Sequence, residues 1–166
     1  KYRYAGSKYR AFARKFDFFI LKFSHNMEDE KSRENALSYF KELIEKLGLS
    51  DRIKILTDHS YESIEDIYKN ASGLIVSSLR EGGPRTVLEA INHNIPVLGT
   101  NVGIMPQIIP RDLLTEAGDQ VSLAALLEEM IPLLPQLDVS AIKIAMHEEY
   151  SLENACIKTK EVYFSL

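Results

Sequence analysis

Glu81-Gly82-Gly83-Pro84-Arg85-Thr86-Val87-Leu88-Glu89 lies between two short apolar runs, residues 73–79 and 95–99. Each run has the length and composition of a buried parallel strand. Between the runs we expect a helix of about three turns, with Pro84 at its first position and Asn94 in the left-handed conformation at its end. Glu81 then lies in the loop at the carboxyl end of a strand, which is the edge where open α/β sheets bind ligands. Glu89 lies inside the helix.

Strand-like and helix-like segments alternate along the rest of the chain. Strands are predicted at 18–23, 53–56 and near 113–114, and helices at about 29–47, 60–71 and 122–134, with one or two more at the end. This alternation indicates a parallel sheet that helices cover on both faces. We therefore expect an α/β fold, a Rossmann-like doubly wound parallel sheet, with residues 1–166 forming a single domain.

Composition sets limits on function. The chain has 166 residues, of which 45% are hydrophobic and 27% charged, with a net charge of −4. An acidic chain is not expected to bind nucleic acid as its main role. The single cysteine, Cys156, gives no disulfide framework and fits a reducing compartment. No apolar run reaches membrane-spanning length, so a cytoplasmic location is expected.

The first 23 residues are basic and aromatic. Their spacing predicts an amphipathic helix, because Ala5, Tyr9, Phe12 and Phe16 recur on one face while Lys and Arg residues occupy the other. A segment of this kind also suits an anionic lipid surface. Peripheral contact with a membrane is therefore the alternative interpretation.

The segment around Glu81 resembles the signature of the retaining, nucleotide-sugar-dependent glycosyltransferases of group 1 (family 4). Their pattern is Glu, seven residues, Glu-Ala, a short helix end and Pro-Val, and this chain has Glu81, Glu89-Ala90 and Pro96-Val97. The resemblance runs from about Asp17 to the end, and it includes Ser78-Leu79, Thr100-Asn101-Val102-Gly103 and Tyr150-Ser151-Leu152-Glu153. It implies the carboxyl-terminal, donor-binding half of a two-domain GT-B fold.

The resemblance also implies roles for single residues. Glu81 would be catalytic: it would contact the donor sugar and stabilise positive charge on the anomeric carbon, while Glu89 would bind the ribose. The other residues assigned to the donor site are Gly82, Gly83, Pro84, Arg85, Thr86, Asn101 and Lys1. The chemistry agrees, because carboxylates accept hydrogen bonds from sugar hydroxyls. In addition, a helix start after glycines can approach a phosphate closely.

Other interpretations of these residues are open. Gly82-Gly83-Pro84 is also typical of a tight strand-to-helix turn, and Glu89 of a solvated helix residue. Lys1 is followed by Tyr2, where the family has Lys-Gly. Ile104 and Gln107 replace a Gly and a Glu of a family loop that faces the donor, so the donor sugar stays open. We expect the domain to lack its first strand and an amino-terminal partner domain.

Three functions from different classes follow. The first is transfer of a sugar, with retention, from a nucleotide-diphosphate sugar to a glycan, lipid or other acceptor, together with the amino-terminal GT-B domain; the isolated chain should then be inactive. The second is another enzyme of this fold, a nucleotide-sugar epimerase or a sugar phosphorylase. The third is a non-catalytic nucleotide-binding module. No cofactor and no metal are expected, because His25, His93 and His147 lack metal-ligand spacing.

Overall fold

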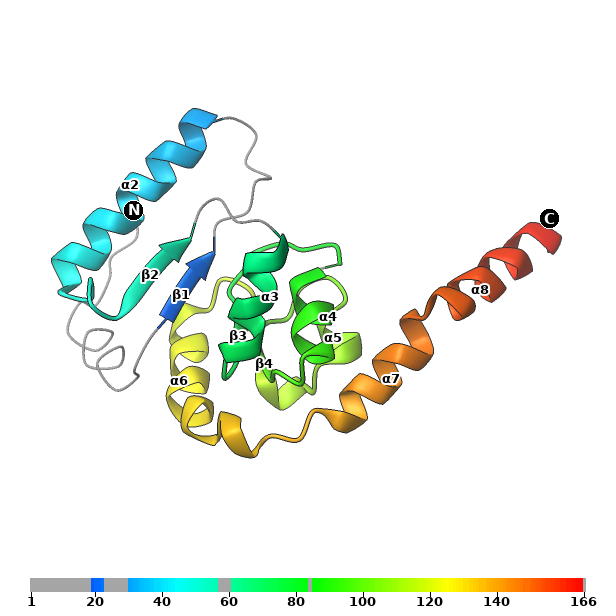
Figure 1. Ribbon diagram of the computed structural model, residues 1–166. Coiled ribbons are helices and arrows are strands. Elements are labelled where there is room, and N and C mark those ends of the chain that lie inside the picture. The colour runs from blue at the N-terminus through cyan, green and yellow to red at the C-terminus, as the bar shows by residue number, and fades with distance from the viewer. Residues whose placement is uncertain (1–18, 23–29, 57–60, 84, 166) are drawn as a thin grey trace. The chain divides into compact units, whose positions relative to one another are not determined.

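The computed structural model describes residues 19–22, 30–56, 61–83 and 85–165, which form two compact units within 1–64 and 65–166. Figure 1 shows the described elements and their labels. Several predictions lie outside the described residues: the amphipathic helix at 5–16, Lys1 and Pro84. Each unit is considered by itself.

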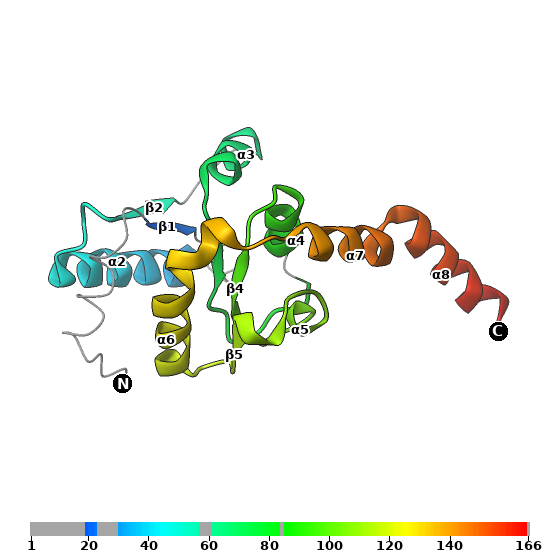
Figure 2. The ribbon, with the colours of Figure 1, turned by 90° about the horizontal axis from the view of Figure 1, so that it is seen from below.

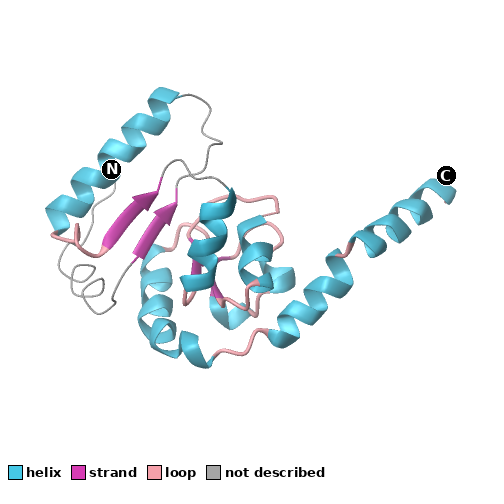
Figure 3. Cartoon of the chain, viewed as in Figure 1, coloured by secondary structure: helices cyan, strands magenta, loops and turns pink. Residues whose placement is uncertain are grey.

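The described part of the first unit contains two parallel strands and one long helix. Strand β1, Phe19–Lys22, pairs with β2, Ile53–Leu56, and Figure 3 shows their arrows pointing the same way. Helix α2, Glu30–Leu47, ends at a Schellman motif. Gly48 has φ +64, its N–H donates to Glu45 O, and the N–H of Leu49 donates to Ile44 O at 3.0 Å. Ile44 and Leu49 also form a buried contact, and the helix ends at Leu47, as predicted.

The second unit is built on a three-stranded parallel sheet. Its strands are β3, Leu74–Val76, β4, Val97–Thr100, and β5, Leu114–Thr115, in the order β3-β4-β5. All four residues of β4 are buried, as expected for a central strand. The predicted α/β fold of parallel strands and helices is confirmed, and the described strands divide into a two-stranded and a three-stranded sheet.

Helices lie on both sides of the β3-β4-β5 sheet. Figures 1 and 2 show α4, Arg85–Asn92, and α5, Met105–Ile108, on one side and α6, Gln120–Met130, on the other. The best-buried side chains lie between α4, α5 and β4, and are Val87, Ile91, Leu98 and Met105. The remaining helices are α3, Tyr61–Asn70, α7, Ser140–Tyr150, and α8, Leu152–Phe164, with 3-10 turns at Arg111–Leu113 and Ile131–Gln136.

Some boundaries differ from the prediction for local reasons. The helix expected at 122–134 ends at Met130 and continues as a 3-10 turn, because Pro132 and Pro135 have no N–H to donate. The strand expected at 95–99 begins two residues later, after Pro96. Helix α4 ends as predicted, with Asn94 at φ +60. Among the described residues, no helix has the length and hydropathy needed to cross a membrane.

Candidate functional site

A chain of hydroxyl groups holds the turn that carries Glu81. Thr100, at the end of β4, is buried, and its Oγ1 donates to the main-chain oxygen of Ser78 at 2.7 Å. Ser78 in turn donates its own hydroxyl to Glu81 Oε1, also at 2.7 Å. Because one oxygen of an otherwise exposed carboxylate is held, the side chain is fixed relative to the end of β3.

A second loop packs against the same turn. Gly103 has φ +55, and a Cβ atom there would lie 2.5 Å from the main-chain oxygens of both Glu81 and Gly82. Only glycine fits this position without displacing the turn. Gly82 and Gly83 differ, because a Cβ atom at either would meet nothing within 4 Å. The space beside both glycines is open, so a ligand can approach their backbone closely.

Glu89 is partly buried and has two partners. It lies in α4, where its side chain is 26% exposed. The hydroxyl of Tyr68 donates to Glu89 Oε2 at 3.0 Å, and Arg85 Nη2 lies 3.8 Å from Oε1. Glu89 is therefore not a purely solvated residue.

The predicted donor residues fall into two groups in the structure. Glu81, Gly82 and Gly83 form the turn after β3, in contact with the Gly103 loop, which also contains Asn101. Arg85, Thr86 and Glu89 lie along α4. Arg85 is 83% exposed, so its guanidinium is available to a ligand. Thr86 is half-buried, and its main-chain oxygen lies 3.5 Å from the hydroxyl of Tyr68.

Asn101 is placed at the carboxyl ends of β4 and β5. Its N–H donates to Thr115 O at 2.7 Å, and its side-chain amide lies 3.4 Å from Glu116 Oε1. It lines a cavity of about 100 Å³ together with Arg111 and Glu116. Thr115 Oγ1 beside it is buried and has no hydrogen-bond partner among the described residues. The cavity is polar and has room for water.

Sequence reasoning assigned no role to four residues that shape the site: Tyr68, Ser78, Thr100 and Gly103. Two of them carried a signal. Tyr68 stands in the apolar stripe of its helix, and a buried tyrosine hydroxyl normally needs a partner. Thr100 is a polar residue at the end of an apolar strand, and buried hydroxyls are normally hydrogen-bonded. The sequence does not show which group accepts the hydrogen bond from either hydroxyl.

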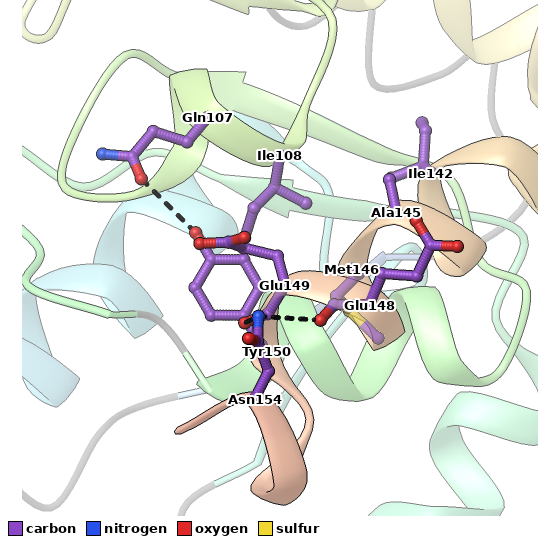
Figure 4. A pocket seen from close by; sticks show the side chains of 9 residues that line it. All are labelled: Gln107, Ile108, Ile142, Ala145, Met146, Glu148, Glu149, Tyr150 and Asn154. Carbon is purple, nitrogen blue, oxygen red and sulfur yellow. Dashed lines mark hydrogen bonds between the residues drawn. The ribbon is translucent and has the colours of Figure 1, made fainter. Parts of the chain in front are cut away.

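A larger cavity lies elsewhere in the second unit. Figure 4 shows it between α5, α7 and α8, with a volume of about 470 Å³. Gln107 lines it and accepts a hydrogen bond from the hydroxyl of Tyr150 at 3.3 Å. None of the predicted donor residues lines this cavity. The 81–89 segment stays the candidate site because it combines held carboxylates, open glycines and a helix start.

The candidate site has no metal-binding cluster within the part of the chain that the structure describes. No group of three His, Cys, Asp or Glu side chains there is arranged to hold a metal ion. The chemistry available at the 81–89 segment is therefore that of carboxylates, hydroxyls, one guanidinium and the N–H groups of the first turn of α4.

Comparisons with known proteins give consistent results. The family model described as "Glycosyl transferases group 1" matches residues 33–135. A phosphatidylinositol N-acetylglucosaminyltransferase subunit of Arabidopsis thaliana is 26% identical over 123 residues, which cover 74% of this chain and 28% of that protein. The chain thus spans little more than a quarter of that relative.

Solved structures share the fold at low identity. Anabaena Alr3699/HepE, in complex with UDP and glucose, has a TM-score of 0.72 at 16% identity, covering 97% of this chain and 52% of its own. The C-terminal domain of a glycosyl transferase group 1 family protein (LpcC) from Francisella tularensis has a TM-score of 0.63 at 18% identity. That match covers 91% of this chain and 96% of the Francisella chain.

Proposed function

Because this chain belongs to the group 1 glycosyl transferases, we propose that it is the donor-binding part of an enzyme that transfers a sugar with retention. The donor would be a nucleotide-diphosphate sugar. The observation that carries the proposal is the pair Glu81 and Glu89, on the turn and the helix that follow β3. In each carboxylate one oxygen accepts a hydrogen bond from a hydroxyl of the protein.

Glu81 is the proposed catalytic residue. In the reaction, the bond between the anomeric carbon and the diphosphate oxygen breaks, and its electron pair leaves with the diphosphate. The anomeric carbon becomes positive before the acceptor oxygen bonds to it, and the proton of the acceptor hydroxyl passes to the departing diphosphate oxygen. A carboxylate held beside that carbon stabilises this charge without reorganising. The hydrogen bond from Ser78 leaves Glu81 Oε2 for the sugar.

The diphosphate would lie at the start of α4. The N–H groups of a first helical turn lack partners within the helix and favour an anion. Gly82 and Gly83 precede this turn with open space beside them, and the exposed Arg85 can supply a cation. Lys1, outside the described residues, is a second proposed cation. Glu89, one turn further along α4, would accept hydrogen bonds from the ribose.

The comparisons suggest which substrates to test first. The Anabaena protein was solved with UDP and glucose, so we propose a uridine diphosphate sugar as the donor. The Arabidopsis relative is named as part of a phosphatidylinositol N-acetylglucosaminyltransferase. UDP-N-acetylglucosamine and phosphatidylinositol are therefore the first donor and acceptor to try, with an amino-terminal domain and peripheral membrane contact as part of the same proposal.

The deciding experiment is calorimetric titration of the 166-residue chain with UDP, GDP and ADP, with and without sugars attached. We expect one of them to bind, and Glu89→Ala to weaken binding by about 1.5–3 kcal/mol, the typical contribution of a hydrogen bond to a charged group. Glu129→Ala, which removes an exposed carboxylate from α6, is the control and should change nothing. Absence of binding by every nucleotide at millimolar concentration would refute the proposal.

A further inference from the structure

Tyr68 connects helix α3 to the carboxylate of Glu89. Its side chain is buried, with 9% of the residue exposed, while its hydroxyl reaches Glu89 Oε2 at 3.0 Å. Tyr68 lies 21 residues before Glu89 in the sequence and outside the 81–89 segment. The same hydroxyl also lies 3.5 Å from the main-chain oxygen of Thr86. The hydroxyl has one proton, and the carboxylate is the closer and stronger acceptor.

A second contact fixes the ring of Tyr68. His93 stacks on it with a centroid distance of 5.4 Å and an interplanar angle of 14°. His93 follows directly after α4, and its N–H donates to Glu89 O at 3.1 Å, so the two side chains lie one turn apart. Tyr68 therefore contacts the 89–93 segment at two points, through its ring and through its hydroxyl. The ring holds the hydroxyl in place, and the hydroxyl holds the carboxylate.

The two oxygens of Glu89 consequently have different surroundings. Oε2 is held from the protein side by Tyr68, whereas Oε1 lies 3.8 Å from the guanidinium of the exposed Arg85. An ion pair at that distance to an exposed Arg is weak and exchanges readily. Oε1 is thus the oxygen that an incoming hydroxyl donor can use. A carboxylate already fixed in one orientation loses less conformational freedom when a ligand binds.

We propose that Tyr68 is a positioning residue for ribose recognition: its hydroxyl fixes Glu89 Oε2, so that Oε1 faces the ribose hydroxyls. This inference rests on the proposed function, because it assigns Tyr68 a part in the same nucleotide site. It extends the site to α3, a helix that the 81–89 segment does not include. The hydroxyl of Ser78 makes the corresponding contact with Glu81, because it donates to Oε1 and leaves Oε2 available.

The test compares two probes on the Tyr68→Phe variant, which keeps the ring and removes only the hydroxyl. The probes are UDP and its 2′,3′-dideoxy analogue, which has no ribose hydroxyls. We expect UDP affinity to fall about fivefold, less than for Glu89→Ala because Tyr68 acts on the ribose only through Glu89. The affinity for the analogue should stay unchanged. In the Glu89→Ala background, which removes the acceptor of the Tyr68 hydroxyl, Tyr68→Phe should have no further effect. Tyr163→Phe, which removes an exposed tyrosine hydroxyl from α8, is the matched control.

The outcomes separate this inference from the proposed function. If the parent chain binds neither probe nor any other nucleotide, the proposed function fails and the inference with it. If the parent binds UDP and Tyr68→Phe binds it equally well, only the inference fails. An equal loss of affinity for both probes would show that the hydroxyl acts through general packing, which also overturns the inference.

Discussion

Gly103→Ala tests the contact between the 101–104 loop and the turn that carries Glu81. The new Cβ atom would lie 2.5 Å from the main-chain oxygens of Glu81 and Gly82, a distance that real Cβ atoms essentially never show. The neighbours are backbone atoms and cannot rotate away, so the loop and the turn must separate by about half an ångström or more. The φ of +55 adds the cost of a left-handed alanine, about 1–2 kcal/mol.

Two other glycines serve as controls that separate the cost of backbone strain from the cost of the close contact. Gly118 also has a positive φ, +86, but its nearest neighbour is a flexible Leu79 atom at 3.6 Å, so Gly118→Ala measures backbone strain alone. At Gly82 the backbone has no left-handed φ, and a Cβ atom would meet nothing within 4 Å, so Gly82→Ala adds neither cost. In urea unfolding we expect losses of about 2–4 kcal/mol for Gly103→Ala, about 1 for Gly118→Ala and none for Gly82→Ala. Equal losses for the first two would refute the loop contact.

Glu81→Ala should leave nucleotide affinity nearly unchanged but lower turnover about a hundredfold or more in the form of the enzyme that transfers sugar; a matching loss of affinity would contradict these separate roles. The 166-residue chain alone should transfer sugar only at trace rates, because in the proposed enzyme a second domain holds the acceptor in line with the donor. Efficient transfer from a radiolabelled donor without a partner protein would disprove this. The pKa of Asp119 lies below its ordinary value of 3.8 because the N–H and the hydroxyl of Ser122 donate to its carboxylate. The stability that this carboxylate, the N-cap of α6, contributes is present above pH 3.8 and is lost as the pH falls through the lower pKa of the folded state. In urea unfolding, Asp119→Asn should therefore weaken the dependence of the unfolding free energy on pH at acid pH. An unchanged dependence would contradict a role of Asp119 as the helix cap.

Local signals in the sequence predicted the fold well. Asn94 follows the end of α4 in the left-handed conformation, as expected from residue type and position alone, and Gly48 adopts the same conformation after α2. The family was recognised correctly from Glu81, Glu89-Ala90 and Pro96-Val97. These features depend on neighbours within a few residues, so the sequence displays them directly.

Contacts between distant segments were not predictable. The bond from Tyr68 to Glu89 joins two helices, and the bond from Thr100 to Ser78 joins the ends of two strands. Each depends on the register with which β3 pairs with β4 and on how α4 packs. The end of β3 at Val76, three residues before the apolar run ends, has the same origin, because pairing with β4 stops there.

Asn94 performs two tasks whose best residues differ, and this constrains how the sequence can vary. Its backbone adopts φ +60, which glycine would adopt with less strain. Its side-chain Oδ1 also accepts a hydrogen bond at 3.1 Å from Lys143 of α7, which donates to Asn92 O as well. Glycine at position 94 would therefore relieve the backbone but remove one of the two acceptors of Lys143, so the residues at positions 94 and 143 should co-vary among relatives.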